Sequence, residues 1–202
     1  MRSLIPVLII CSMEPGAQAT LPRRSTEAIK TLDGFSRCVG KQRSEAIRLL
    51  ATLPESDEEH RQANRIATSS CLASGMLKFR ANLMRGTIAE FILKADRKAL
   101  RRPEEKYTFD VPAEDILSRA PGGQQAAIAL VLFGQCVAHE NSMGVKAILG
   151  TSVETRAEIE AFRPLTGAMT KCSTANFKVD RFQMRGYLAE GAYREFVAAG
   201  PA

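Results

Sequence analysis

Residues 78–90 and 178–190 of this chain repeat one pattern at a fixed distance of 100 positions. Six of the thirteen residues are identical, and both segments end in R-G-x-x-A-E. A second pattern, F-x-x-C-V, begins at Phe35 and again at Phe133. Because both patterns recur in the same order, the sequence indicates one supersecondary unit used twice, with each copy burying its apolar face against the other. The repeated motif residues are Arg85, Gly86, Ala89 and Glu90, then Arg185, Gly186, Ala189 and Glu190.

Apolar residues at helical spacing predict the first helix of each copy. In the first copy they are Ile29, Leu32, Phe35 and Val39. Intervals of three and four residues are typical of a helix with one buried face. The corresponding stretch of the second copy, residues 126–133, is apolar on all sides. We therefore expect it to lie in the most buried helix of the chain.

Capping boxes predict the start of a third helix in each copy, after a short second helix whose buried face begins at Ala46. In a capping box, a hydroxyl and a carboxylate three residues apart satisfy the first free amides of a helix. The two candidates are Ser56-x-x-Glu59 and Thr151-x-x-Glu154. Pro164 lies within the third helix of the second copy and predicts a kink there.

A short alternating stretch follows in both copies. Residues 77–79 and 177–179 place an apolar residue on each side of a lysine, which favours an extended segment. A continuing helix is the alternative, because apolar residues between 77 and 95 also fit helical spacing. Two extended stretches could form one short two-stranded β pairing between the copies.

Together these patterns predict an all-α fold of two tandem helical units, related by a pseudo-two-fold axis and packed as one compact domain. Each unit should hold about three to four helices. The expected boundaries are a signal peptide over 1–19, the first unit over 20–98, a linker over 99–122 and the second unit over 123–202. The linker assignment rests on the charged, proline-containing composition of that stretch.

Residues 1–19 have the order of a cleaved secretory signal. A positive charge near the start precedes an apolar run over residues 4–13, and the small residues Ala17 and Ala19 lie before the expected cleavage site. The run is shorter than the roughly 20 apolar residues that span a bilayer. The alternatives are a frayed N-terminal helix and lipid attachment at Cys11, which the large residue before that cysteine disfavours.

Removal of the signal would leave an even number of cysteines: Cys38, Cys71, Cys136 and Cys172. An even number in an exported chain indicates disulfides, because the compartment is oxidising. Each of the three possible connectivities respects a two-fold relation, so the repeat alone does not choose among them. Because each unit is expected to close on itself, we predict the pairs Cys38–Cys71 and Cys136–Cys172.

The R-G-x-x-A-E motif has a structural interpretation. A glycine inside a helix costs about 1 kcal/mol relative to alanine, so its use at Gly86 and Gly186 indicates a close crossing of two helices. An arginine and a glutamate five residues apart cannot pair well within one helix. The expected pairs between the copies are Arg85 with Glu190 and Arg185 with Glu90. The alternative is that Arg85 and Arg185 bind an anion.

No motif for catalysis, cofactor binding or metal binding stands out. His60 and His139 have no second ligand at metal spacing, and the chain has no G-x-S-x-G motif or glycine-rich phosphate loop. Cys136 lies three residues before His139, but a disulfide would remove its thiol. The carboxylates within 55–59 and 154–160 lie at expected helix starts, where negative charge favours the helix dipole. We therefore predict no catalytic residue, no cofactor and no metal.

The net charge of +6 is modest, and few aromatic residues are present to stack on bases, which disfavours nucleic acid as a partner. Basic residues gather over 94–102, where a helix end explains them through its dipole. The alternative is contact with an envelope protein or an anionic envelope surface. No segment of the mature chain is expected to span a membrane.

The pattern of Phe35, Cys38 and Val39, then Cys71 with Leu72, then R-G-x-x-A-E resembles exported helical proteins of alphaproteobacteria that have no assigned activity. The second copy departs from it with Ser173 in place of leucine. The resemblance covers most of the mature chain and implies an exported bacterial helical protein.

We therefore expect a non-catalytic periplasmic or secreted protein that serves as a binding or structural module of the cell envelope. The alternative is a hydrolase of an envelope polymer, with carboxylates in a cleft between the copies.

Overall fold

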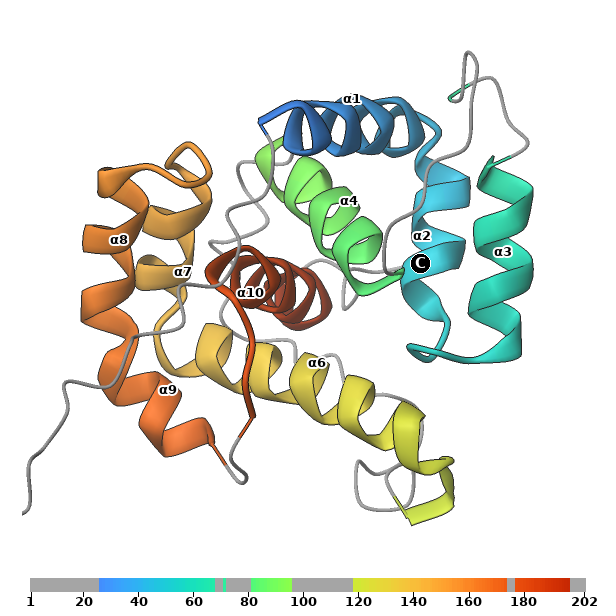
Figure 1. Cartoon of the computed structure of the whole chain (residues 1–202). Helices are drawn as coiled ribbons and strands as arrows, with labels where there is room; N and C mark the ends of the chain where they lie inside the picture. Colours follow the sequence, from blue (N-terminus) through green and yellow to red (C-terminus); the bar gives the residue numbers. More distant parts are fainter. Residues whose placement is uncertain (1–25, 68–70, 72–80, 96–117, 174–176, 197–202) are drawn as a thin grey trace, which may run out of the picture.

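The computed structural model describes residues 26–67, 71, 81–95, 118–173 and 177–196 (Figure 1). All regular elements in these ranges are helical, which confirms the all-α prediction. The predicted signal peptide and most of the predicted linker lie outside the described residues. The elements are α1 (Thr26–Lys41), α2 (Arg43–Ala51), α3 (Asp57–Ala67), α4 (Ala81–Ala95), α6 (Gly122–Glu140), α7 (Ser142–Leu149), α8 (Arg156–Phe162), the 3-10 turn η2 (Arg163–Leu165), α9 (Thr166–Cys172) and α10 (Arg181–Phe196).

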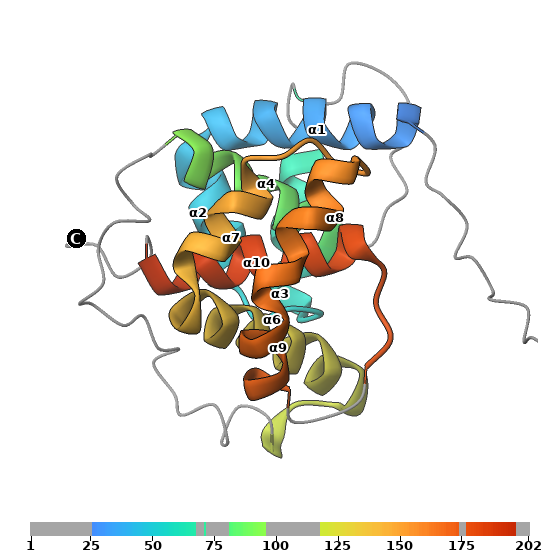
Figure 2. The same ribbon diagram turned by 90° about the vertical axis from the view of Figure 1, so that its left-hand side faces the viewer.

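Helix α10 lies at the centre of the molecule, between α4 and α6 (Figure 1). Turning the molecule by 90° places α1 above α10 and α6 below it (Figure 2). Helices α1 to α4 form what we call the first half, and α6 to α10 the second half. Each half contains a long first helix that packs against its own last helix: α1 against α4, and α6 against α10.

The apolar faces read from the sequence supply the core. Leu32, Phe35 and Val39 of α1 are buried as expected, and so are Ala46, Leu49 and Leu50 of α2. All of these except Leu32 join one continuous cluster with apolar residues of α4, α6, α7 and α10, whereas Leu32 packs in a smaller cluster with Leu83 and Phe182. Burial of each large aliphatic side chain contributes roughly 1.5–3 kcal/mol, so this cluster is the main source of stability.

The most buried helix is α10, and the expectation for residues 126–133 was wrong. Every residue from Met184 to Phe196 is buried. In α6, by contrast, Ala126 and Ala129 are exposed. The reason is position: α10 is covered on both sides by α4 and α6, whereas one face of α6 meets solvent.

Glycines allow these helices to approach closely. A β-carbon added to Gly86 would overlap the Cα of Gly186 and lie 2.8 Å from its carbonyl oxygen, so α4 and α10 cross here backbone to backbone. One turn further, Ala89 and Ala189 are fully buried. A second close crossing joins α6 to α10, where a β-carbon on Gly191 would overlap the backbone of α6.

One capping box was predicted correctly and the other was displaced by four residues. The amide of Glu59 donates to Ser56 Oγ (3.1 Å), and the Glu59 carboxylate accepts from the amide of Glu55 (2.6 Å). In the second half the capping residues are Thr155 and Glu158, not Thr151 and Glu154. They make the same pair of bonds, at 3.2 and 2.9 Å.

Thr151 ends helix α7 instead, donating its hydroxyl to the Ile148 carbonyl. Glu154 adopts a positive φ of 58°, as Glu55 does at 56°, so each box is preceded by a left-handed turn residue. The predicted break at Pro164 is confirmed, because α8 gives way there to η2 and then to α9.

Both predicted disulfides are confirmed. Cys38 of α1 is joined to Cys71, and Cys136 of α6 to Cys172 at the end of α9, with Cα–Cα distances of 5.5 and 5.8 Å. Each bond closes a loop within its own half. Loops of this length stabilise a fold by roughly 3–4 kcal/mol on the chain-entropy model.

The proposed pairing of residues 77–79 with 177–179 cannot be followed, since the first stretch lies outside the described residues. The second has no strand geometry, and the ring of Phe177 packs 4.9 Å from that of Phe133, centroid to centroid. Within the described ranges, every helix is too short or too polar to cross a membrane.

The glycine crossing predicts a contrast between two glycine-to-alanine substitutions. Gly86→Ala should destabilise the protein by about 1–3 kcal/mol, because the backbone of Gly186 cannot move aside. Gly34→Ala, in α1, meets nothing within 4 Å and should stabilise it by up to about 1 kcal/mol. Urea unfolding followed by circular dichroism measures both. Loss of stability in both variants would contradict the assignment of the crossing.

Candidate functional site

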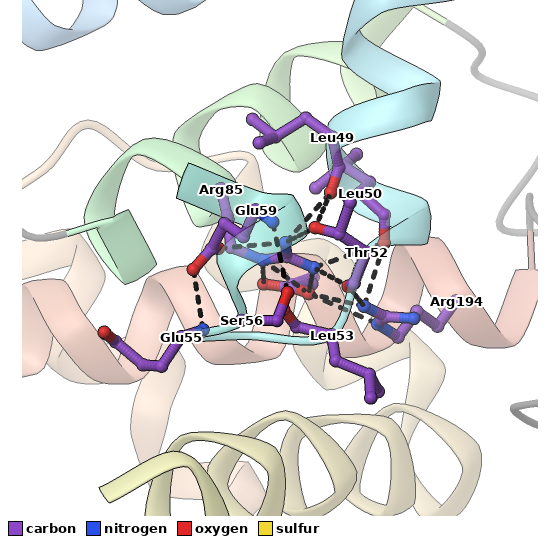
Figure 3. A network of polar contacts seen from close by, with 10 residues as sticks. Leu49, Leu50, Thr52, Leu53, Glu55, Ser56, Glu59, Arg85 and Arg194 are labelled. Carbon is purple, nitrogen blue, oxygen red and sulfur yellow. Dashed lines mark hydrogen bonds and ion pairs between the residues drawn. The ribbon is translucent and has the colours of Figure 1, made fainter. Parts of the chain in front are cut away.

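A buried network of charged groups centres on Arg85 (Figure 3). Its guanidinium donates to the carboxylate of Glu190, at 2.6 Å from Nη2 and 3.1 Å from Nε, and to Glu59 at 3.0 Å from Nη1. Arg85 and Glu59 are fully buried and Glu190 is nearly so. One arginine from α4 thus joins the start of α3 to the centre of α10.

The same guanidinium satisfies the end of helix α2. Figure 3 shows Arg85 and Arg194 converging on this segment. Arg85 donates to the carbonyl of Leu49 and to the hydroxyl of Thr52, and both arginines donate to the carbonyls of Leu50 and Thr52. The last carbonyls of a helix lack partners within it and carry partial negative charge, so two buried cations stabilise this end.

A corresponding network surrounds Arg185. Its guanidinium binds both oxygens of Glu90, at 2.8 and 2.7 Å, and donates to Glu158 at 2.9 Å. It also donates to the Thr151 hydroxyl and to the carbonyls of Leu149 and Thr151, at the end of α7. The arginine of each half therefore binds the capping glutamate of its own half and the motif glutamate of the other.

Burial and pairing oppose each other in setting the pKa values of these carboxyls. Burial alone would raise the pKa of Glu190, but Arg85 and Arg194 outweigh it and lower the pKa below 4.5. Burial is likewise outweighed at Glu90, whose pKa is lowered by Arg185 and Lys94. At Glu59 burial prevails over Arg85 and raises the pKa.

The two networks differ in exposure. The Glu190 side chain is 2% exposed and its helical neighbour Arg194 is 1% exposed. At the corresponding position of the first half stands Lys94, which binds Glu90 at 2.5 Å, and these side chains are 51% and 13% exposed. The Glu90 network therefore reaches the surface, whereas the Glu190 network is closed.

A pocket of about 660 Å³ opens beside Glu90, within the volume range of small-molecule sites. One wall is α1 and another is α4. The third side is formed by residues 151–153 and by Phe182 and Arg185 of α10. The pocket thus lies between the halves, where the polar network of Arg185 forms part of its lining.

Corresponding positions of the two halves carry different residues, and this difference explains why the pocket is open. Aligned on F-x-x-C-V, the pocket-lining residues Lys30, Asp33 and Arg37 of α1 correspond to Ile128, Val131 and Gln135 of α6. Ile128 and Val131 are buried. In the second half apolar side chains occupy these positions, and the close crossing at Gly134 and Gly191 brings α6 against α10. In the first half the same positions carry charges exposed to solvent.

The chemistry around the pocket does not resemble a hydrolytic centre. Glu90 is ion-paired on both sides and its pKa is lowered, so it is a poor proton donor. Asp33 is exposed and bound to Arg37 at 2.9 Å. In the described part of the chain no cluster of three metal-ligating side chains occurs. His139 is half-exposed and bonded to Glu195 at 2.8 Å.

All eight motif residues meet at the crossing of α4 and α10, with the arginine–glutamate pairs that the sequence analysis expected. The contributions of Glu59, Glu158 and Arg194 were missed. The two glutamates had been recognised only as helix-start residues, and nothing local distinguishes Arg194 from a surface arginine. The fixed offset of 100, which aligns Arg194 with Lys94, was the available signal.

Comparison with family models, with curated proteins and with solved structures yields no match to this chain.

Glu190→Gln and Glu90→Gln form a matched pair that tests the difference between the networks. The first change leaves two buried arginines short of a counter-charge and should cost about 3–5 kcal/mol. The second acts at a more exposed pair, where solvent can compensate, and should cost about 1–3 kcal/mol. Urea denaturation at neutral pH measures both. Equal losses would contradict the distinction between a closed and an open network.

The pKa shifts predict opposite pH dependences for Glu190 and Glu59. Because the folded-state pKa of Glu190 is lowered, its stabilising contribution is present above 4.5 and is lost as the pH falls through the folded value. The pKa of Glu59 is raised, so its contribution is present below 4.5 and is lost as the pH rises through the folded value.

Relative to wild type, Glu190→Gln should therefore be least destabilising in acid. Glu59→Gln should become more favourable as the pH rises above 4.5. Unfolding free energies measured between about pH 3 and 8 test this. Parallel curves for the two variants would overturn it.

Proposed function

We propose that this protein is a non-catalytic, exported binding module and that the pocket beside Glu90 is its ligand site. The observation that carries the proposal is the contrast between the halves. The same arginine–glutamate network is closed by apolar side chains in one and borders an open pocket with charged walls in the other. The closed network is explained by its contribution to the stability of the fold. An open, charge-lined pocket adds no packing contacts, so its presence needs another explanation.

The site is supported by a rigid lining. Arg185 donates to carboxylates, a hydroxyl and carbonyls around its whole guanidinium, so its side chain is held in one position. Ligand sites bind more tightly when their walls are ordered before binding, since less conformational entropy is lost. Arg185 therefore positions Glu90, while Lys94 and the α1 side chains remain accessible.

Export is supported by the two disulfides, which persist in oxidising compartments such as the periplasm or the extracellular space. The secretory pattern of residues 1–19 and the resemblance to exported alphaproteobacterial proteins agree with this location. A role in the cell envelope, as a binding or structural module made of two tandem units, follows from the same reasoning. The basic stretch after Lys94, a candidate contact for an anionic surface, lies outside the described residues.

A hydrolase of an envelope polymer is the alternative. It needs an acid and a base that converge on one bond. The partly buried carboxyl at the pocket, Glu90, has a lowered pKa, and the acidic group on α1 is exposed and paired with an arginine. These features favour binding over catalysis.

Filling the pocket should abolish ligand binding without unfolding the protein. Ala95 is exposed and lines the pocket, so Ala95→Trp should obstruct it while leaving the core intact. Ala51→Trp, on an exposed position of α2 away from the pocket, is the matched control. The measurement is NMR of labelled protein with a panel of small carboxylates, amines and alcohols.

At least one class should shift the amide signals of Thr87 and Val153 in wild type and Ala51→Trp, but not in Ala95→Trp. No response to any class, or an unchanged response in Ala95→Trp, would refute the proposal. Release of fragments from purified peptidoglycan, lost in Glu90→Gln, would establish the hydrolase instead.

A further inference from the structure

We infer that the ligand of this pocket is a small organic anion with an apolar body, bound by its acidic group to the cations of α1 and α4. This inference rests on the proposed function and narrows it to a ligand class. Its basis is the balance of charges on the pocket walls, the position of the apolar side chains and the counterpart in the second half.

Four cationic side chains line the pocket against two carboxylates. The cations are Lys30, Arg37, Lys94 and Arg185, and the carboxylates are Asp33 and Glu90. Behind the wall, Glu158 also neutralises Arg185. Four cations against these three carboxylates leave a net positive charge at the pocket. Because low-dielectric walls concentrate the field of such charges, an anion is drawn into the pocket and a cation is repelled.

The accessible donors lie on two facing helices. Lys94 uses one interaction for Glu90 and is half-exposed. Arg37 binds Asp33 through Nε at 2.9 Å, so its two terminal nitrogens are not used in that pair. Lys30 is exposed on the same face of α1, one turn before Asp33 and near the other end of the pocket wall. A carboxylate or phosphate monoester in the pocket can accept hydrogen bonds from the donors nearest to it on α1 and α4.

Both carboxylates, in contrast, are already neutralised. Glu90 is bound by Arg185 and Lys94, and its pKa is lowered, so it stays ionised within these pairs. A cationic ligand would have to displace Lys94 and would leave that ammonium group without its partner. The arrangement therefore selects against amines as well as favouring acids.

Apolar side chains give the ligand its second part. Ile29, Phe91, Val153 and Phe182 line the pocket among the charged groups. Val153 packs on a small cluster of Leu32, Leu83 and Phe182, so this side of the pocket continues into buried apolar structure. A volume of about 660 Å³ exceeds what a bare acid group requires. An apolar body attached to the acid would use the remaining space.

The second half supplies an internal comparison. Where α1 presents Lys30 and Arg37, α6 presents Ile128 and Gln135, and the corresponding space is closed. Cations thus occur at these positions in the half with the open pocket and not in the half that is filled. Helix packing does not require a cation at either position, because α6 carries isoleucine and glutamine at the corresponding positions.

A series of probes with one chain length tests the ligand class. The probes are decanoate and decyltrimethylammonium below their micellar concentrations and decanol below its solubility limit, with acetate as an acid that lacks the apolar body. Isothermal titration calorimetry measures affinity, and Ala95→Trp reports whether binding is in the pocket. Decanoate should bind in the pocket at least about tenfold more tightly than each other probe, and added salt should weaken it.

A second set of experiments removes positive charges from the pocket wall. Lys94→Gln and the double variant Lys30→Gln/Arg37→Gln should each weaken decanoate binding about three- to tenfold and leave decanol unchanged. Arg61→Gln, an exposed arginine of α3 away from the pocket, removes one charge and should leave both unchanged. Melting curves of all variants establish that they are folded.

Equal binding of decanol and decanoate, or tighter binding of the ammonium probe, would overturn the anion assignment. If that binding is lost in Ala95→Trp, the pocket remains a ligand site and only its ligand class is wrong. If none of the decyl probes binds in a manner that Ala95→Trp abolishes, the anion assignment fails, and the wider panel then decides whether the pocket binds anything.

Discussion

The crossed pairing of Arg85 with Glu190 and of Arg185 with Glu90 is the interaction on which the rest of the structure depends. A buried guanidinium without a carboxylate costs several kcal/mol, and each arginine finds its motif carboxylate only in the other half. The contact of Gly86 with Gly186 lets both pairs form at one crossing. The same arginines also hold the ends of α2 and α7 and the starts of α3 and α8, so most helix positions follow from this crossing.

The two arginine–glutamate networks have similar residues but different surroundings, and the one around Glu90 borders a pocket. Around Glu190 the charges are buried under apolar side chains, and they act only to hold helices together. Around Glu90 the network is made of the same residue types but ends in a half-exposed lysine at an open pocket. Substitutions on the α1 wall of the pocket should therefore leave Arg185 in place, because Arg185 is held by Glu158 and by the carbonyls of Leu149 and Thr151 rather than by α1.

The crossing could be predicted from sequence because each motif holds a helical glycine and an arginine and a glutamate five residues apart, and because the two motifs stand at a constant offset of 100 positions. The burial of α10 could not. Charged residues such as Arg194 and Glu195 mark a solvated helix unless their partners are known, and those partners are carbonyls of α2 and side chains of α6. The pocket was also beyond sequence, since its lining brings α1 and α4 together with residues 151–153 and α10, which lie far along the chain. The second capping box was displaced because threonines occur at two equivalent spacings.

The crossed pairing also sets an order of events for a chain that is synthesised from its N-terminus. Arg85 emerges long before Glu190, which lies on the last described helix. Until α10 arrives, the first half holds a cation destined for its interior without the main counter-ion, so its closed form is penalised. The buried network of the first half is therefore completed only after α10 has been synthesised, late in the described part of the chain.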